Sequence, residues 1–277
     1  MRVGVICDME YTHSPCFRNY YYSARNLFED VKLVKGPGDL EGLDIVIVGN
    51  NHYRGHLNIY NTNGFIDRCN FLGIRMVMFT AESIHLSYFP ENLRTQKNLE
   101  RFNQLTQYVI DVNDHIILGK KLMRGLMSRD FMNKHTVVEK KDKVVFIGKY
   151  REDEYSKRRN LLSSFKGVDI LSYPIASWEE YMKTIGSYRF VLSPVSNGAF
   201  FPLRFYEILL TGSIPLQQVS EDLLDYYKTE ASFDDCIFFE TVEQLEEKLT
   251  NCDWQNCDSE TWMEPHMEQL FREDGLI

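Results

Sequence analysis

The sequence lacks any long apolar run: no stretch approaches the roughly 20 consecutive apolar residues that a membrane-spanning helix needs. Its first residues, MRVGVICDMEY, hold one Arg and a short apolar run. They show neither the longer apolar segment nor the small-residue cleavage site of a secretory signal peptide. We therefore expect no membrane span and a cytoplasmic location.

Two common nucleotide-binding motifs are also missing. No GxGxxG follows the first apolar strand, and GxxxxGK[ST] occurs nowhere in the chain. The first absence argues against a standard dinucleotide enzyme, and the second argues against a P-loop NTPase.

The six cysteines are scattered and contain no CxxC pair. In an intracellular chain of this size they are interpreted most simply as reduced, partly buried thiols. Cys252, Cys257 and His266 form a weak candidate metal cluster, because two cysteines and one distant histidine are a poor zinc signature. We predict no metal site.

The net charge of −9 is unevenly distributed. Residues 220–277 hold 3 Lys and Arg against 17 Asp and Glu, whereas the preceding residues hold 28 against 23. The acidic character thus belongs to the C-terminal region, and a polyanionic partner for the rest of the chain stays open.

Short apolar strands alternate with helices through the first half of the chain. Strands are expected at 2–7, 31–34, 44–48, 75–79 and 108–111, with helices at 15–28, 61–72 and 92–107. This alternation predicts an α/β unit with a parallel sheet covered on both faces.

The second half repeats this pattern after a polar segment at 133–142, which is a plausible linker. Strands are expected at 143–147, 168–171, 190–193 and 214–217, helices at 157–165, 177–185 and 203–210, and an acidic helical region from 242. We predict two Rossmann-like, doubly wound domains, 1–138 and 139–277, that face a central cleft.

The segment 190–217, FVLSPVSNGAFFPLRFYEILLTGSIPLQ, carries the most informative chemistry. Pro202 precedes a helix and Gly212 follows it, which are typical boundary residues. Arg204 and Glu207 are three residues apart and share one helical face. Arg204 could bind a diphosphate, and Glu207 could accept hydrogen bonds from the vicinal hydroxyls of a ribose. Alone, the spacing favours a surface ion pair.

A second segment, KVVFIGKYREDEYSKRRNLLSSF at 143–165, places a glycine and a basic loop after a strand. Gly148 would let the backbone approach a ligand closely. Arg151 and one of the basic residues at 157–159 could neutralise a diphosphate leaving group. A solvated basic helix start is the alternative for the others.

The RFYEILLTGSIPL pattern resembles the donor-binding segment of GT-B glycosyltransferases. Together with 143–165 it resembles the family of T-even phage DNA β-glucosyltransferases over residues 143–217. The resemblance implies a UDP-sugar co-substrate, with no metal required; the chain also lacks an evident DxD motif. It implies that Arg151, Arg158, Arg204 and Glu207 bind the donor. We add Gly148 and Asn197 as further candidate donor-binding residues.

In the phage family a strand ends in Phe-Thr-Asp, and that Asp is the base on the acceptor hydroxyl. Here Phe79 and Thr80 are followed by Ala81 and Glu82, so Glu82 is one position displaced and is the candidate catalytic base. Rival bases are Asp8, Glu10, His52 and His85. For acceptor binding we select His52, Arg54 and His85.

Three functions are weighed. The first is transfer of a hexose or pentose to a 5-hydroxymethylated pyrimidine in phage DNA, which would occur in the host cytoplasm. The second is a glycosyltransferase that acts on a cell-surface glycan or other saccharide. The third is a non-catalytic nucleotide-sugar-binding protein. The near-neutral to basic body favours DNA, whereas the acidic C-terminal region and the lack of a Lys/Arg stripe count against it.

Overall fold

The computed structural model divides into two compact units, Met1–Phe131 with Trp262–Ile277, and Met132–Thr261. It describes residues 1–7, 16–50, 63–80, 100, 104, 106–109, 119–123, 128, 130, 139–151, 156–171, 177–194, 203–219, 237–251 and 263–277. Among these residues, no helix combines the length and apolar character needed to cross a membrane.

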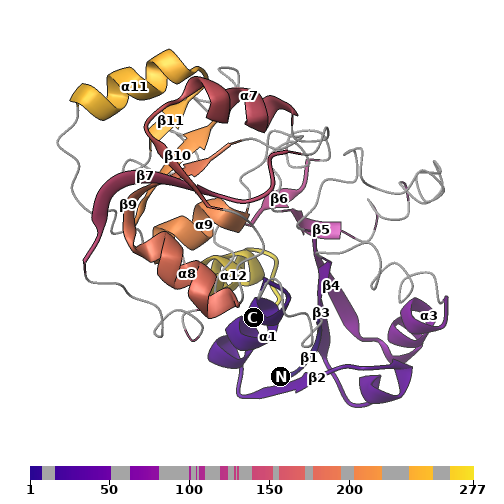
Figure 1. Ribbon diagram of the computed structural model, residues 1–277. Helices are drawn as coiled ribbons and strands as arrows, with labels where there is room; N and C mark the ends of the chain where they lie inside the picture. The colour runs from indigo at the N-terminus through magenta and orange to yellow at the C-terminus, as the bar shows by residue number, and fades with distance from the viewer. Residues whose placement is uncertain are drawn as a thin grey trace. The chain divides into compact units, whose positions relative to one another are not determined.

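Unit 1 is built on a six-stranded, all-parallel sheet in the order β2-β1-β3-β4-β5-β6. Its strands are β1 (Arg2–Ile6), β2 (Asp30–Leu33), β3 (Ile45–Asn50), β4 (Arg75–Thr80), β5 (Thr106–Val109) and β6 (Lys121–Leu122). Its helices are α1 (Cys16–Leu27), the 3-10 helix η1 (Pro37–Leu40), α3 (Asn63–Leu72) and α12 (Met263–Glu273). In Figure 1, α1 and α12 lie on one side of this sheet and α3 on the other.

An aromatic cluster forms the core between the sheet of unit 1 and α1 and α12. The Phe79 ring lies 5.3 Å from Tyr20, 4.9 Å from Tyr108 and 6.1 Å from Phe271, measured between centroids. Tyr20 leaves no room beside the backbone of Gly49, where an added Cβ would clash with its ring. Tyr20 is therefore a packing residue of unit 1.

Helix α12 joins unit 1 through two polar clusters as well as through Phe271. Glu264 accepts hydrogen bonds from Ser23, Asn26 and Ser128. Beyond the helix, Asp274 accepts from the Tyr108 hydroxyl and the Lys121 ammonium, each at 2.6 Å. These contacts correct the expected boundary: the second domain was expected to run to residue 277, but the final helix returns to the first sheet.

Unit 2 is built on a five-stranded parallel sheet in the order β11-β10-β9-β7-β8. Its strands are β7 (Lys141–Ile147), β8 (Val168–Leu171), β9 (Tyr188–Ser193), β10 (Ile214–Gln218) and β11 (Ile237–Phe239). Its helices are α7 (Ser156–Ser164), α8 (Trp178–Gly186), α9 (Leu203–Leu210) and α11 (Val242–Asn251).

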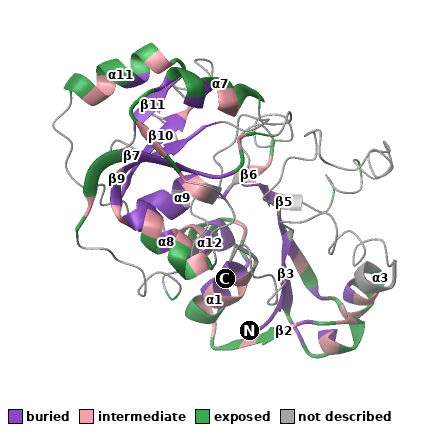
Figure 2. Ribbon diagram, viewed as in Figure 1, coloured by how far each residue is buried: buried purple, intermediate pink, exposed green. Residues whose placement is uncertain are grey.

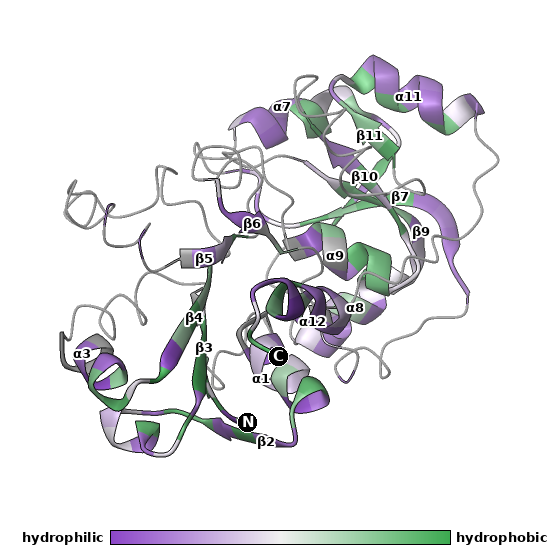
Figure 3. Ribbon diagram, turned by 180° about the vertical axis from the view of Figure 1, so that it is seen from behind, coloured by the Kyte–Doolittle hydropathy of each residue, from purple (hydrophilic) through white to green (hydrophobic). Residues whose placement is uncertain are grey.

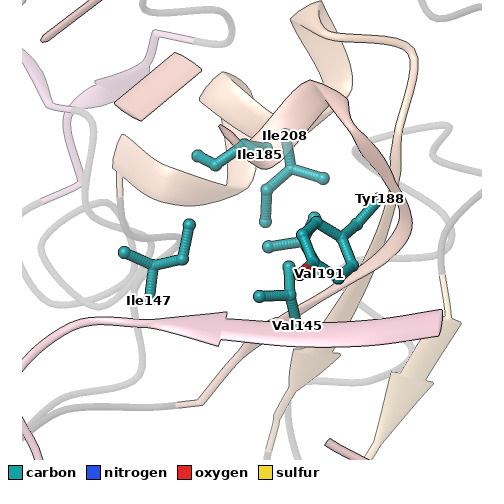
Figure 4. Close-up of a cluster of buried hydrophobic side chains, with 6 residues drawn as sticks. All are labelled: Val145, Ile147, Ile185, Tyr188, Val191 and Ile208. Atoms are coloured by element: carbon teal, nitrogen blue, oxygen red, sulfur yellow. The ribbon is translucent and has the colours of Figure 1, made fainter. Parts of the chain in front are cut away.

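The helices of unit 2 cover both faces of its sheet, with α7 and α11 on one side and α8 and α9 on the other (Figure 1). Figure 4 shows the core under α8 and α9, formed by Val145, Ile147, Ile185, Tyr188, Val191 and Ile208. The central strands are buried, whereas α7 and α11 have exposed outer faces (Figure 2) that are largely hydrophilic (Figure 3). On their inner sides, α7 buries Leu161 and Leu162, and α11 buries Leu245.

A polar network closes the amino-terminal edge of this sheet. The Lys140 ammonium donates to the carbonyls of Gly186 and Thr211, at 2.9 and 2.8 Å, and to the Ser213 hydroxyl at 3.0 Å. It lies at the carboxyl ends of α8 and α9, where a cation is favoured. Burial nevertheless lowers the pKa of Lys140 to about 8. The buried polar groups at this edge are thus supplied with partners.

The structure confirms the α/β class and the two parallel sheets. It adds β6 and β11, two short strands that the sequence pattern did not reveal. Strand β7 begins at Lys141, inside the expected linker, and β5 begins at Thr106, where a helix was expected to continue.

Candidate functional site

The strand order of unit 2 contains a topological switch point. Strand β7 lies between β8 and β9, so the chain moves to one side after β7 and returns to the other side after β8. Open α/β sheets bind ligands outside the carboxyl ends of the strands at such a point. Here those ends are Ile147, followed by Gly148, and Ser193, followed by Pro194.

Helix α9, which follows β9 in the chain, brings Arg204 and Glu207 to this region. Its apolar residues Phe205, Ile208 and Leu209 are buried. The helix ends where Gly212 adopts a φ of 67°, with its amide donating to the Leu209 carbonyl.

Glu207 is a buried carboxylate with little compensation for its burial. Its side chain is 6% exposed, and among the described residues the Tyr181 hydroxyl is its hydrogen-bond donor, at 2.8 Å from Oε2. Burial raises the pKa of Glu207 to about 7, although the Tyr181 hydrogen bond and the charge of Arg204 oppose the rise. A carboxylate in this state gains from any ligand that donates hydrogen bonds to it.

Arg204 does not pair directly with Glu207 in the described part of the chain. Its Nε donates to the Tyr181 hydroxyl at 3.3 Å, so Tyr181 bridges the two side chains. Its guanidinium carbon lies 5.4 Å from the centre of the Phe146 ring, within the range of a cation–π contact. The simple surface ion pair that the spacing allowed is therefore not what forms.

Gly148 is required by the position of Arg204. Its φ of 151° is a conformation that favours glycine, and an added Cβ would lie 3.0 Å from Arg204 Nη2 and 3.2 Å from Phe146 Cζ. The sequence suggested that this glycine admits a ligand; the neighbour it admits in the structure is the Arg204 guanidinium.

The basic loop and helix start supply a second guanidinium to the same ring. The Arg158 guanidinium carbon lies 5.7 Å from the Phe146 ring centre, and its Nη1 donates to the Lys149 carbonyl at 2.7 Å. The guanidinium groups of Arg158 and Arg204 thus both contact the Phe146 ring. Arg151 is exposed and instead contacts Tyr150, with its guanidinium carbon 5.5 Å from that ring centre.

Two further polar atoms lie at the carboxyl ends of β9 and β10. Ser193 and Gln217 are neighbours in register and are 0% and 1% exposed. Among the described residues, Ser193 Oγ and Gln217 Oε1 have no hydrogen-bond partner. Buried polar atoms are rarely left without a partner, so this edge offers unused hydrogen-bonding capacity.

Five residues selected from the sequence lie outside the described residues: Glu82, His52, Arg54, His85 and Asn197. Strand β4 ends at Thr80, two residues before Glu82, and β3 ends at Asn50. The roles assigned to these residues stay predictions.

Sequence reasoning missed Tyr181 and Phe146. Tyr181 belongs to an amphipathic helix with Trp178, Met182 and Ile185, and Phe146 belongs to an apolar strand. Both patterns indicate core residues and give no sign of contact with Arg204. Among the described residues, no three His, Cys, Asp or Glu side chains are grouped so that they could hold a metal ion.

No protein-family model matches this chain, and no curated protein does either. Among solved structures it is similar to the DNA-modifying enzyme β-glucosyltransferase, which was determined with and without its substrate uridine diphosphoglucose. The match has 12% identity and a TM-score of 0.47, and covers 98% of this chain and 94% of that one. A likeness this distant assigns neither a family nor a reaction to this chain.

Proposed function

We propose that this chain is a glycosyltransferase of the GT-B type that uses a nucleotide sugar, with a UDP-type donor bound by unit 2. One observation carries the proposal. At the β7/β9 switch point, the buried carboxylate of Glu207 accepts one hydrogen bond from the described residues and lies one helical turn from Arg204. The guanidinium groups of Arg204 and Arg158 both contact the Phe146 ring.

The carboxylate suits a ribose. Tyr181 occupies Oε2 of Glu207, and Oε1 accepts no hydrogen bond from the described residues. Vicinal hydroxyl groups could therefore donate to Oε1 and to the remaining lone pair of Oε2. A hydrogen bond to an ionised group is stronger than one between neutral groups, which favours a ligand of this kind.

The guanidinium pair suits a diphosphate. Arg204 and Arg158 would bind the phosphate oxygens and stabilise the negative charge that develops as the nucleoside diphosphate leaves. Gly148 supports this arrangement by making room for Arg204. We include Arg151 and Asn197 as further donor-binding residues, the first at the exposed edge of the basic loop.

The acceptor would be bound by residues of the first unit. Glu82 would take the proton from the acceptor hydroxyl as its oxygen bonds to the anomeric carbon. The bond from that carbon to the diphosphate oxygen breaks, and the nucleoside diphosphate leaves with the bonding pair. His52, Arg54 and His85 would contact the acceptor, and no metal ion is required.

The leading acceptor is a 5-hydroxymethylated pyrimidine in DNA. Residues 1–219 carry more basic than acidic side chains, which is compatible with a polyanion. Access to such a base requires that the nucleotide be flipped out of the duplex. A saccharide acceptor is the second candidate, favoured by the acidic charge of residues 220–277.

The test is incubation with a panel of radiolabelled nucleotide sugars, starting with uridine diphosphoglucose, and duplexes that contain hydroxymethylated pyrimidines. We expect a labelled nucleoside of the added sugar mass, with a rate that falls steeply as salt rises. Transfer to an oligosaccharide but not to DNA at low salt would select the second candidate.

A nucleotide-sugar-binding protein without catalysis would show donor binding but no transfer to any acceptor. The Glu82→Gln variant separates the roles of the two units: donor affinity should be retained while transfer is lost. Full transfer by Glu82→Gln would return the base role to Asp8, Glu10, His52 or His85, or indicate a retaining mechanism.

A further inference from the structure

Tyr181 occupies a central place in the site although no sequence motif marks it. It lies on α8, and its hydroxyl is 2.8 Å from Glu207 Oε2 and 3.3 Å from Arg204 Nε. Its ring packs on Trp178, with 5.3 Å between ring centres, and against the apolar core below α8. The hydroxyl is thus held from one side by packing and from the other by two charged groups.

The direction of the two hydrogen bonds follows from valence. Arg204 Nε can only donate, so the Tyr181 oxygen accepts from it. The hydroxyl proton then points to Glu207, whose carboxylate can only accept. This orientation directs Oε2 toward Tyr181 and leaves Oε1 without a hydrogen bond from the described residues.

We propose that Tyr181 is a positioning residue of the donor site: its hydroxyl holds the Glu207 carboxylate and the Arg204 guanidinium in a fixed relation, so that the site distinguishes ribose from 2′-deoxyribose. The inference rests on the proposed function, because it assumes that Glu207 binds sugar hydroxyls and Arg204 binds phosphate. Tyr181 itself need not touch the donor. Without its hydroxyl the carboxylate can rotate, and its alignment with vicinal hydroxyls is lost.

A role in packing alone makes a different prediction. Tyr181→Phe keeps the ring and therefore its contacts with Trp178 and the core, so the variant is expected to fold. If Tyr181 only supported the fold, the substitution would change the affinities for UDP and 2′-deoxy-UDP little and to the same extent. If it positions Glu207, the loss falls mainly on UDP.

The experiment measures the affinities of UDP and 2′-deoxy-UDP by titration calorimetry. The wild-type protein should bind UDP about 10-fold or more tightly than 2′-deoxy-UDP. Y181F should reduce that preference to about 2- to 3-fold, because the loss of one hydrogen bond lowers affinity by a factor of this order. Tyr188→Phe is the matched control, because Tyr188 is a buried tyrosine of the same core whose hydroxyl faces Lys141. It should keep the wild-type preference.

The pH dependence of UDP binding provides a second measurement. Among the described residues, Tyr181 and Arg204 are the titratable or charged groups that act on Glu207, and the Tyr181 hydrogen bond lowers its pKa. In Y181F the pH at which UDP affinity is half-maximal should therefore move upward. A variant that lost only packing would leave this midpoint unchanged.

A double substitution completes the test. Y181F should have no further effect on the UDP preference in an E207Q background, because Tyr181 acts through Glu207. If E207Q loses the preference while Y181F keeps it, the positioning role is wrong and the donor site stands. If the wild-type protein binds neither nucleotide, the proposed function fails together with this inference.

Discussion

Among the described residues, each unit buries one glutamate, and the two accept very different numbers of hydrogen bonds. Glu264 of unit 1 and Glu207 of unit 2 are both 6% exposed. Oε1 of Glu264 accepts from two serine hydroxyls and one asparagine amide, at 2.6 to 3.2 Å. Glu207 accepts one hydrogen bond from the described residues, from Tyr181.

Their positions on the helices strengthen the contrast. Glu264 lies in the first turn of α12, where the helix dipole favours a negative charge. Glu207 is the fifth residue of the eight-residue helix α9, away from that end. The first glutamate ties α12 to α1 and Ser128, whereas the second retains hydrogen-bonding capacity. The comparison shows that equal burial does not imply an equal supply of hydrogen bonds: among the described residues Glu264 accepts three and Glu207 accepts one.

The largest effect should come from removing the compensated glutamate. Glu264→Ala leaves Ser23, Asn26 and Ser128 without their acceptor, and we expect unit 1 to lose about 3–5 kcal/mol of stability. Urea denaturation combined with hydrogen exchange in α1 and α12 would measure it. Glu268→Ala on the same helix removes only an exposed pair with Arg272 and should cost about 0.5 kcal/mol or less. Equal losses of stability in the two variants would show that Glu264 has no special structural role.

The second effect has the opposite sign. The pKa of Glu207 is about 7 in the folded protein against an ordinary value of 4.5, so the folded state binds more protons between these values. The stabilisation from its protonated form is complete below pH 4.5 and is lost as pH rises through 7. At pH 8 the charged side chain should cost about 3 kcal/mol.

Glu207→Gln should therefore stabilise the ligand-free protein at pH 8. It should also reduce the change in the free energy of unfolding between pH 4.5 and 7. Thermal or urea unfolding across that range would measure the difference from wild type. Glu179→Gln, which alters an exposed residue of the neighbouring helix, should change stability by about 0.5 kcal/mol or less. If Glu207→Gln destabilised the protein at pH 8, the carboxylate would be structural, as in unit 1.

The sequence predicted α9 and its two polar residues well because the signals are local. Pro202, Gly212 and the apolar spacing mark the helix, and three residues of separation place Arg204 and Glu207 on one face. Tyr181 lies 26 residues from Glu207 in the chain, and no local pattern reports how α8 packs on α9.

The same reason explains the error over the last helix. Residues 263–273 form an amphipathic pattern, which shows that one face is buried but not against which sheet. Glu264 and Asp274 look like surface charges in an acidic segment, yet the structure pairs both with residues of unit 1. The acidic composition of the last helix therefore did not indicate which sheet it packs against, because that depends on tertiary contacts.

The third effect concerns nucleotide binding. Arg204→Ala should lower the affinity for UDP by about 10- to 100-fold, because a hydrogen bond from a charged group to phosphate contributes about 1.5–3 kcal/mol. Its affinity for uridine, which has no phosphate, should change little. Glu207→Ala should weaken both ligands, since both carry the ribose hydroxyls. Titration calorimetry with the two ligands separates these patterns.

Arg189→Ala is the control for charge in the same unit, because Arg189 is partly exposed and pairs with Asp142. It should leave UDP affinity within about 2-fold of the wild-type value. Unchanged UDP affinity in both Arg204→Ala and Glu207→Ala would show that the donor site has been assigned wrongly.

The smallest effect extends the contrast from two glutamates to two serines of unit 2. Ser193 and Ser213 are both 0% exposed. Ser213, at the amino-terminal edge, accepts from Lys140 and Thr211 and donates to the Tyr188 carbonyl at 2.8 Å. Ser193, at the carboxyl-terminal edge, has no partner for its hydroxyl among the described residues. The edge at which open α/β sheets bind ligands is thus the edge with unmet hydrogen bonds.

Ser213→Ala should therefore cost about 1–2 kcal/mol of stability, whereas Ser193→Ala should be neutral or stabilise the ligand-free protein by about 1 kcal/mol or less. Urea denaturation of the two variants measures this difference in parallel. If the two substitutions lower stability equally, the Ser193 hydroxyl has a hydrogen-bond partner in solution. The polar groups at the carboxyl-terminal edge would then be as fully hydrogen-bonded as those at the amino-terminal edge. If Ser193→Ala stabilises the protein, the Ser193 hydroxyl lowers the stability of the ligand-free fold, as the charge of Glu207 does. Binding of a ligand at this edge would then explain why both groups are present.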